Sequence, residues 1–252
     1  MGSRETRVRY LYMKKHKPFT ALFFASCLFA AGYCRAANPY AGKFFADGDP
    51  KKPEFALTFD DGPGYDTEDL LKLLEKHNVK ATFFMLGTSA RAYPDRVKKV
   101  AEAGHLICSH TDSHLFWPRT GKLPDHEAIL EKELARASAS IEKASGVRPA
   151  ILRMPNGYDK PWVRKLAGKL GYTLVNWTYG SDWTKLPEEK KLEGYLKALR
   201  PGAILLMHDG GGKSREKDLS IIEAVLDAAA KKGLKPVRID DLLGLRAPGG
   251  KR

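Results

Sequence analysis

Short apolar runs alternate with amphipathic segments along most of this chain, and this alternation most constrains its fold. Seven apolar runs predict strands, at 54–60, 81–87, 105–110, 150–154, 172–177, 202–208 and 235–239. Amphipathic patterns predict helices near 67–77, 93–103, 125–145, 160–170, 188–199 and 218–232. Strands that alternate with helices favour a parallel α/β architecture, because a crossover connection joins parallel neighbours.

Glycines and polar motifs refine this prediction. Glycines stand where four of the predicted helices should stop, at Gly104, Gly146, Gly171 and Gly233. The polar motifs all fall at or just after strand ends, which is where barrel active sites lie. We therefore predict a distorted (β/α) barrel with about seven parallel strands in preference to an open sheet. The 252 residues are enough for one sizeable domain.

The first 36 residues resemble a targeting segment. A basic region from Arg4 to Lys17 precedes an uncharged run from Phe19 to Cys34, and a small-x-small pattern ends at Ala36. The uncharged run is shorter than the roughly 20 residues that a membrane-spanning helix needs. Two outcomes stay open. Secretion or periplasmic release after cleavage ranks first, and a membrane anchor or lipid tether ranks second.

The remaining chain divides into three predicted parts. Residues 37–53 are rich in Gly, Pro and Asp and predict a linker, 54–245 form the catalytic domain, and 246–252 form a tail. Net charge is +13, and seven basic residues with one acidic residue in 1–36 supply part of it. The moderately basic remainder suits an anionic cell-envelope polymer, and equally a generic solubilising charge. The sequence contains no basic repeat interleaved with aromatic residues, which is the pattern that would indicate nucleic-acid binding.

Cysteine usage agrees with an exported domain. After cleavage of the targeting segment only Cys108 would remain, so no disulfide could form within the mature chain. Cys108 lies in a predicted strand, which favours a buried structural thiol.

Two adjacent carboxylates close the first predicted strand. Asp60 and Asp61 end the apolar run, and Gly62 and Pro63 then turn the chain. Neighbouring like charges at a strand end are costly unless something uses them. A metal ion or a catalytic proton transfer would do so.

A pair of histidines follows the third predicted strand. His110 and His114 are four residues apart, which places them on one face of a helical turn. Taken alone the pair is weak, because many such pairs are surface histidines. Together with a strand-end carboxylate it forms a set of two His and one Asp. That set is typical of a catalytic zinc site with an open position.

Three weaker motifs follow later strands. They are Arg153 to Tyr158, Ser181 to Trp183, and Leu205 to Gly210, with His208 at a strand end. Each also has a structural interpretation: a surface loop, a structural Asp-Trp pair and a core histidine. Asp209 and the glycines after His208 favour a histidine that opens onto a cleft.

In this order and spacing, the five motifs resemble the polysaccharide deacetylase family, also called NodB-like or family 4 carbohydrate esterases. The resemblance covers nearly all of residues 54–240 and implies a distorted barrel of about seven or eight βα units. It implies a metal triad of Asp61, His110 and His114, holding Zn²⁺ or another divalent ion such as Co²⁺.

The resemblance also implies roles for other residues. Asp60 is similar to the general base and Arg153 to the arginine that tethers it. His208 resembles the general acid, and Asp182 the carboxylate that pairs with it. Trp183 and Leu206 resemble walls of the pocket for the acetyl methyl group.

Physical chemistry supports these roles. Amide hydrolysis needs an activated water, which a divalent metal supplies, and an acid for the leaving amine. A carboxylate beside His208 would raise its pKa, and Arg153 beside Asp60 would keep the base ionised. A backbone N–H near Asn156 could add oxyanion stabilisation.

Two positions depart from the family pattern. Asn156 stands where the family usually has Tyr or Phe, and Tyr158 could substitute in part as a substrate-binding ring. Tyr179 stands where the fourth motif usually carries another Asp, although Asp182 is kept. The first departure leaves the shape of the substrate groove open.

Three functions are therefore compared. The leading hypothesis is a secreted metal-dependent N-deacetylase acting on N-acetylglucosamine units of peptidoglycan, chitooligosaccharide or an exopolysaccharide, with no nucleic-acid partner. The second is a metal-dependent amidase or deformylase acting on a non-polymeric amide. The third is an inactive carbohydrate-binding member of the family, which the intact set of polar residues argues against. The glycan, the native metal and the oligomeric state stay open.

Overall fold

The computed structural model describes residues 38–211 and 216–245 of the chain. The predicted targeting segment 1–36 and the tail 246–252 lie outside these described residues. Within the described ranges no helix combines the length and apolar character needed to cross a bilayer.

The strands of the described residues form one sheet in which every pair is parallel. They are β1 Phe44–Phe45, β2 Glu54–Asp60, β3 Thr82–Met85, β4 Leu106–Ser109, β5 Ile151–Leu152, β6 Thr173–Val175, β7 Tyr179–Gly180, β8 Ile204–His208 and β9 Lys235–Pro236. Their order is β1-β6-β5-β4-β3-β2-β8-β7, and β9 pairs with the start of β2.

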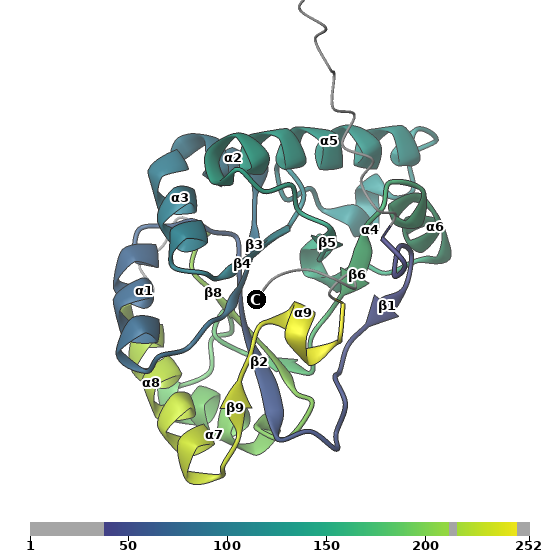
Figure 1. The fold of residues 1–252 in the computed structure, drawn as a ribbon. Helices are drawn as coiled ribbons and strands as arrows, with labels where there is room; N and C mark the ends of the chain where they lie inside the picture. The colour runs from purple at the N-terminus through teal and green to yellow at the C-terminus, as the bar shows by residue number, and fades with distance from the viewer. Residues whose placement is uncertain (1–37, 212–215, 246–252) are drawn as a thin grey trace, which may run out of the picture. The chain divides into compact units, whose positions relative to one another are not determined.

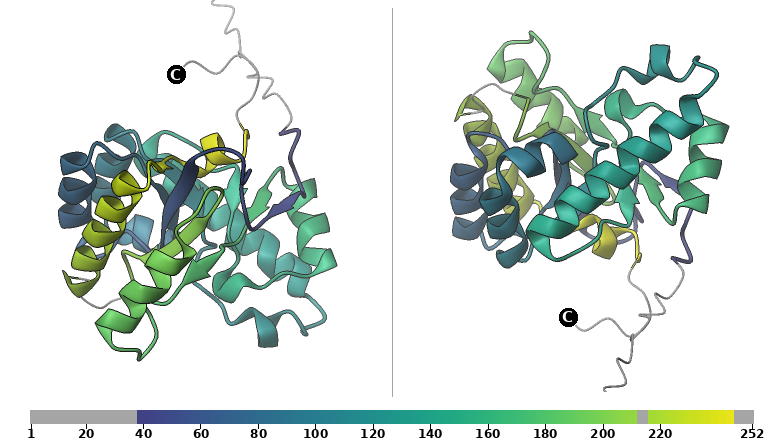
Figure 2. Two further views of the ribbon diagram at one scale, coloured as in Figure 1. Left: turned by 90° about the horizontal axis from the view of Figure 1, so that it is seen from below. Right: turned by 90° about the horizontal axis from the view of Figure 1, so that it is seen from above.

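Most of the helices lie outside the sheet in the views of Figures 1 and 2, whereas the short α9 packs against its interior apolar residues. They are α1 Thr67–Lys76, α2 Gly87–Ala92, α3 Pro94–Glu102, α4 Trp117–Thr120, α5 His126–Ser145, α6 Pro161–Lys169, α7 Glu188–Ala198, α8 Glu216–Lys231 and α9 Ile239–Leu242, with a 3₁₀ turn η1 at Pro155–Gly157. Neighbouring helices contact one another in the order α7, α8, α1, α3, α5, α6. Figure 1 shows α1, α3 and α8 along one flank and α5 above it.

The connection from β6 to β7 shows how strongly the sheet curls. These two strands lie far apart in the sheet order, yet residues 176–178 alone join them. The four Cα–Cα steps from Val175 to Tyr179 span at most about 14 Å. The two ends of the sheet must therefore approach each other, and the Thr178 hydroxyl donates to the Ala46 carbonyl beyond β1. The prediction of a distorted barrel of parallel strands is confirmed.

Every predicted apolar run contains a strand, and each predicted helix is present within a few residues. Two short strands, β1 and β7, were not predicted. Strand β1 lies inside 37–53, where a linker was expected, and that interpretation is corrected. Phe44 and Phe45 pair with β6, and the Gly42 N–H donates to the Tyr172 carbonyl, so this segment extends the sheet.

Side-chain alternation along β2 determines which polar groups face the barrel interior. Phe55, Leu57 and Phe59 pack outward with the helices in the largest apolar cluster. Successive strand residues point to opposite faces, so Thr58 and Asp60 point inward. The interior apolar layer below them contains residues from six strands and α9, namely Ala56, Phe84, Cys108, Ile151, Val175, Ile204, Ile239 and Leu242.

The predicted helix stops are present as expected. All four glycines have positive φ, and α5 ends in a left-handed residue, Gly146, at φ 74°. Glycine favours this conformation because it has no Cβ to clash.

Candidate active site and metal centre

The two adjacent aspartates face different partners. Asp60 is the last inward residue of β2 and is 2% exposed. Asp61 follows with φ 69°, in the left-handed region, so the backbone turns between the two carboxylates. Gly62 completes the turn where a Cβ would lie 2.2 Å from the Asp209 carboxylate. The turn therefore requires a residue without a side chain.

Asp61, His110 and His114 converge on one point. Asp61 Oδ1 lies 3.5 Å from His110 Nε2 and 3.6 Å from His114 Nε2. These three ligand atoms all lie within 4.8 Å of one another, and they form the one such group found among the described residues. Within the same part of the chain, Asp61 Oδ1 is buried and has no hydrogen-bond partner. A buried oxygen facing two imidazole nitrogens fits a divalent metal ion.

A hydrogen bond at Nδ1 orients the His110 ring so that its Nε2 faces Asp61. Its Nδ1–H donates to the Arg153 carbonyl at 2.8 Å, which leaves the Nε2 lone pair facing Asp61. Burial lowers the pKa of His110 to about 3, although the Asp61 charge opposes this effect. The ring is therefore neutral at pH 7, as metal binding requires.

The two histidines meet in a loop, which corrects the expectation of a helical turn. Residues 110–114 have no helical structure, and Thr111 and His114 have φ of 68° and 54°. The ring centroids of His110 and His114 are nonetheless 5.2 Å apart. The spacing of four residues indicated the right pair for the wrong geometric reason.

Arg153 is fully buried and spans the barrel interior beneath the site. Its Nη1 donates to Asp60 Oδ1 at 2.7 Å and to the Thr58 hydroxyl at 2.9 Å. Its Nε and Nη2 donate to the carbonyls of Val175 and Asn176 at 3.3 and 3.0 Å. With this many partners, the guanidinium holds Asp60 in a single orientation.

The charge state of Asp60 depends on opposing effects. Burial raises the pKa of this carboxyl above its ordinary value, and the Arg153 and His208 charges lower it without fully offsetting burial. Arg153 alone thus does less than expected to keep Asp60 ionised. A divalent cation held by Asp61 would lower the pKa of Asp60 further.

His208 and Asp182 form a pair on the other side of the cavity. His208 Nδ1 lies 3.0 Å from Asp182 Oδ2, and the His208 backbone N–H donates to the same oxygen at 2.9 Å. Burial lowers the pKa of His208, but the hydrogen bond and charge of Asp182 outweigh it, so the pKa is raised. Register places His208 beside Asp60 on neighbouring strands.

A cavity of about 350 Å³ joins these groups. Its lining residues are Asp60, Asp61, His110, His114, Asn156, Trp177, Trp183, Leu206 and His208. The cavity therefore includes Asn156, Trp183 and Leu206, which were expected to bind substrate. Tyr158 lies elsewhere, packed near Trp117 and Trp162, so it does not replace the missing ring at Asn156.

Several contributing residues were missed. Trp177 lines the cavity, and its ring centroid lies 5.6 Å from the Arg153 guanidinium carbon. The Tyr195 hydroxyl accepts the backbone N–H groups of Ser181 and Asp182 at 3.0 and 3.2 Å and donates to the Leu206 carbonyl at 2.8 Å. Two-residue periodicity back from Asp60 would have indicated Thr58. No local pattern indicated Tyr195, which lies on α7.

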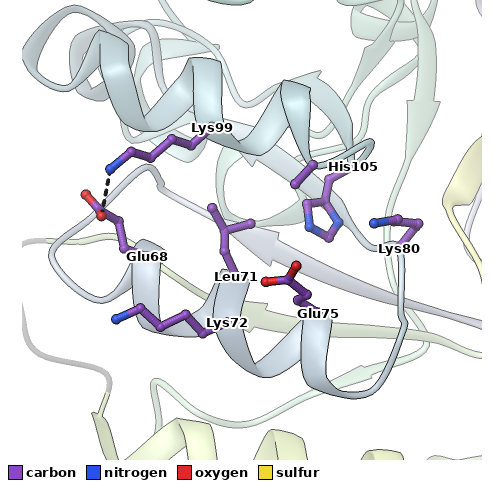
Figure 3. Close-up of a pocket in the computed structure, with 8 residues that line it drawn as sticks. Glu68, Leu71, Lys72, Glu75, Lys80, Lys99 and His105 are labelled. Atoms are coloured by element: carbon purple, nitrogen blue, oxygen red, sulfur yellow. Dashed lines mark hydrogen bonds and ion pairs between the residues drawn. The ribbon is translucent and has the colours of Figure 1, made fainter.

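A second hollow lies outside the barrel, and we call it the α1–α3 groove (Figure 3). Its volume is about 360 Å³, and its lining residues are Glu68, Leu71, Lys72, Glu75, Lys80, Lys99, Ala103 and His105. Lys99 Nζ donates to Glu68 at 2.8 Å across it. The α1–α3 groove contains none of the motif residues.

Known proteins share both the sequence and the fold. The family model for polysaccharide deacetylase matches residues 47–175. A peptidoglycan-N-acetylglucosamine deacetylase of Bacillus cereus is 32% identical, over 75% of this chain and 87% of that protein. A chitooligosaccharide deacetylase of a Bradyrhizobium strain is 33% identical, over 64% of this chain and 73% of that protein.

Solved structures agree with these matches. The Bc1960 peptidoglycan N-acetylglucosamine deacetylase superposes with a TM-score of 0.74 at 28% identity, covering 81% of this chain and 94% of that one. A pseudoenzyme of the same family from Bacillus anthracis superposes with a TM-score of 0.71 at 24% identity, covering 81% and 69%. The matched sequence, the curled parallel sheet and the Asp-His-His group together establish that this chain belongs to the polysaccharide deacetylase family, the NodB-like family 4 carbohydrate esterases.

Proposed function

We infer that this protein is a metal-dependent N-deacetylase that removes acetyl groups from N-acetylglucosamine units of a cell-envelope or extracellular polysaccharide and releases acetate. Family membership alone does not carry this inference, because a structurally similar member is a pseudoenzyme. The different partners of the Asp60 and Asp61 carboxylates carry this inference. One carboxylate faces the two histidines and the other faces Arg153, within a single cavity.

Asp61, His110 and His114 would hold the metal, which we propose is Zn²⁺ or another divalent ion such as Co²⁺. When bound, such an ion supplies a Lewis acid for the carbonyl and lowers the pKa of a water toward 7.

Asp60 is proposed as the general base. Arg153 holds one of its oxygens at 2.7 Å, while the other, Oδ2, lies 3.6 Å from His110 Nε2 beside the proposed metal site. This second oxygen can therefore take a proton from the attacking water. A general base positioned in this way typically increases the rate by about 10²- to 10⁴-fold.

His208 is proposed as the general acid. Its Nδ1 is engaged by Asp182, which leaves Nε2 for the cavity. The raised pKa of His208 favours the imidazolium form, which can protonate the leaving amine. Tyr195 supports Asp182 from below through the two backbone N–H groups that its hydroxyl accepts.

The substrate would lie over the remaining cavity walls. Leu206 is apolar, buried and lines the cavity, which suits an acetyl methyl group. Trp183 is 47% exposed, with its ring edge-on to His208 at 5.3 Å between centroids, so it can contact a sugar ring. Asn156 has φ 57°, and its backbone N–H is the proposed oxyanion donor.

The function can be tested by acetate release from peptidoglycan, chitooligosaccharides and poly-N-acetylglucosamine. We expect release from at least one glycan, its loss after chelation and its recovery with Zn²⁺ or Co²⁺. Activity that survives complete metal removal would contradict the mechanism. Release from none of the three would favour a small-amide substrate or a binding role.

We also propose that the protein acts outside the cytoplasm, in the cell envelope or secreted. The basic and uncharged pattern of residues 1–36 supports this proposal. Fractionation of cells that express the full chain, with N-terminal sequencing of the product, would distinguish cleavage from membrane retention.

A further inference from the structure

Helices α2 and α5 hold the loop that carries both histidines. Residues 110–114 have no repeating backbone hydrogen bonds of their own, and Thr111 and His114 are both left-handed. Non-glycine residues keep that conformation only where their surroundings impose it. The contacts that impose it here come from outside the loop.

Glu133 supplies the densest of these contacts. It lies on the inner face of α5 and is 7% exposed. Its Oε2 accepts the backbone N–H groups of Asp112 at 3.1 Å and Ser113 at 2.8 Å. Its Oε1 accepts the Ser113 hydroxyl at 2.8 Å. One buried carboxylate thus uses both oxygens on two consecutive loop residues that directly precede His114.

Helix α2 holds the same loop from the other side. Arg91 donates to both carboxylate oxygens of Asp112 at 2.6 and 3.0 Å. The backbone N–H groups of Gly87 and Thr88 donate to the carbonyls of Thr111 and Asp112, each at 3.0 Å. A Cβ at Gly87 would lie 2.1 Å from Asp112 Oδ1, so this close approach needs glycine.

The two histidines depend on these supports to different degrees. The Nδ1–H of His110 donates to the Arg153 carbonyl, so its ring has an anchor of its own. In the described part of the chain, no hydrogen bond to the ring of His114 is found, and that side chain is 32% exposed. The direction of the His114 ring therefore depends on the backbone of residues 112–114.

We propose that Glu133 is a positioning residue that sets His114 in the metal site by holding the Asp112–Ser113 backbone. This inference rests on the proposed metal-dependent function. Partners that orient metal ligands affect metal affinity by about 10- to 100-fold when removed. Glu133 acts on His114 indirectly, through the backbone, yet it accepts two backbone N–H groups at once.

The test measures Zn²⁺ and Co²⁺ affinity by competition with a chromophoric chelator, together with the visible spectrum of the Co²⁺ form. We expect Glu133→Ala to weaken affinity about 10-fold or more and to change the Co²⁺ spectrum. Glu133→Gln should stay within about threefold of wild type, because the amide oxygen can still accept both backbone N–H groups. Glu133→Asp, which keeps the charge but is shorter, should weaken affinity and provides a second variant if the alanine protein does not fold.

Ile141→Ala is the matched control. Ile141 is fully buried on the same helix and packs in the large outer cluster. Ile141→Ala should lower the unfolding midpoint and leave metal affinity unchanged, which separates positioning from general loss of stability. Wild-type affinity and spectrum in Glu133→Ala, or in Glu133→Asp if the alanine protein does not fold, would overturn the inference alone. Failure of the wild type to bind metal, or binding that His110→Ala does not weaken, would instead overturn the proposed function.

Discussion

The barrel cavity and the α1–α3 groove are almost equal in volume, about 350 and 360 Å³, but differ in how their charges are held. In the cavity, Arg153 is fully buried and Asp60 is 2% exposed. In the groove, the side chains of Lys72 and Lys99 are 75% and 52% exposed. Exposed ion pairs contribute little, whereas buried charges must be paired or used.

Buried titratable groups sharpen the contrast. His105, at the α1–α3 groove, accepts the Ala81 backbone N–H at 3.0 Å, and burial lowers its pKa to about 4. It is neutral and structurally satisfied. In the barrel cavity, Asp61 Oδ1 is buried and lacks a hydrogen-bond partner within the described residues. Size therefore does not distinguish the two hollows. What distinguishes the barrel cavity is a buried carboxylate oxygen that lacks a hydrogen bond and faces two imidazole nitrogens.

The largest expected effect is at Asp60. Asp60→Asn should lower kcat/KM by about 10³-fold while metal content stays near wild type, because the role proposed for Asp60 is proton transfer and not metal binding. Acetate release and elemental analysis of the purified protein measure the two quantities. A variant that lost its metal together with its activity would show that the two aspartates are misassigned.

Removal of a ligand comes next. His114→Ala should weaken Zn²⁺ binding by more than about 100-fold, since even partners that only orient a ligand are worth about 10- to 100-fold. A competition titration measures the affinity. His126→Ala, the same substitution at a histidine of α5 outside the Asp-His-His group, is the control. Unchanged zinc occupancy in His114→Ala would rule out the triad.

A smaller, pH-dependent effect is expected at Asp182. The acid must be protonated, so activity falls as pH rises through the pKa of His208, which Asp182 raises. Asp182→Asn removes this effect, so the alkaline limb of the kcat/KM profile should move to lower pH. We expect a loss of about 10- to 100-fold at pH 8. An alkaline limb at the wild-type position would contradict the role of His208 as the acid.

The smallest effects should come from the α1–α3 groove. Lys99→Ala removes the ion pair with Glu68, which is exposed and therefore weak. We expect kcat/KM to change by less than about twofold and the urea midpoint to move little. Glu75→Gln, in the same groove, should behave alike. A tenfold loss of kcat/KM in either variant, with stability unchanged, would make the groove part of the substrate site and break the comparison.

Much of the fold was predictable because strands and helices leave periodic patterns. The seven predicted strands and the helix stops at Gly104, Gly146, Gly171 and Gly233 are all present. Strand β1 was not predictable, because two phenylalanines in a Gly- and Pro-containing segment carry no recognisable period. Its pairing with β6 depends on a partner more than a hundred residues away.

The sequence by itself determined the set of candidate residues, because the adjacent aspartates, the histidine pair, Arg153 and His208 all lie at or just after strand ends. Only the tertiary structure decided how they are oriented. The turn at Asp61, the left-handed loop at His114 and the Glu133 contacts depend on groups brought together by the curled sheet. Local sequence can indicate that a side chain is polar and near a strand end. Which buried atom it meets is decided by packing between segments distant in the chain.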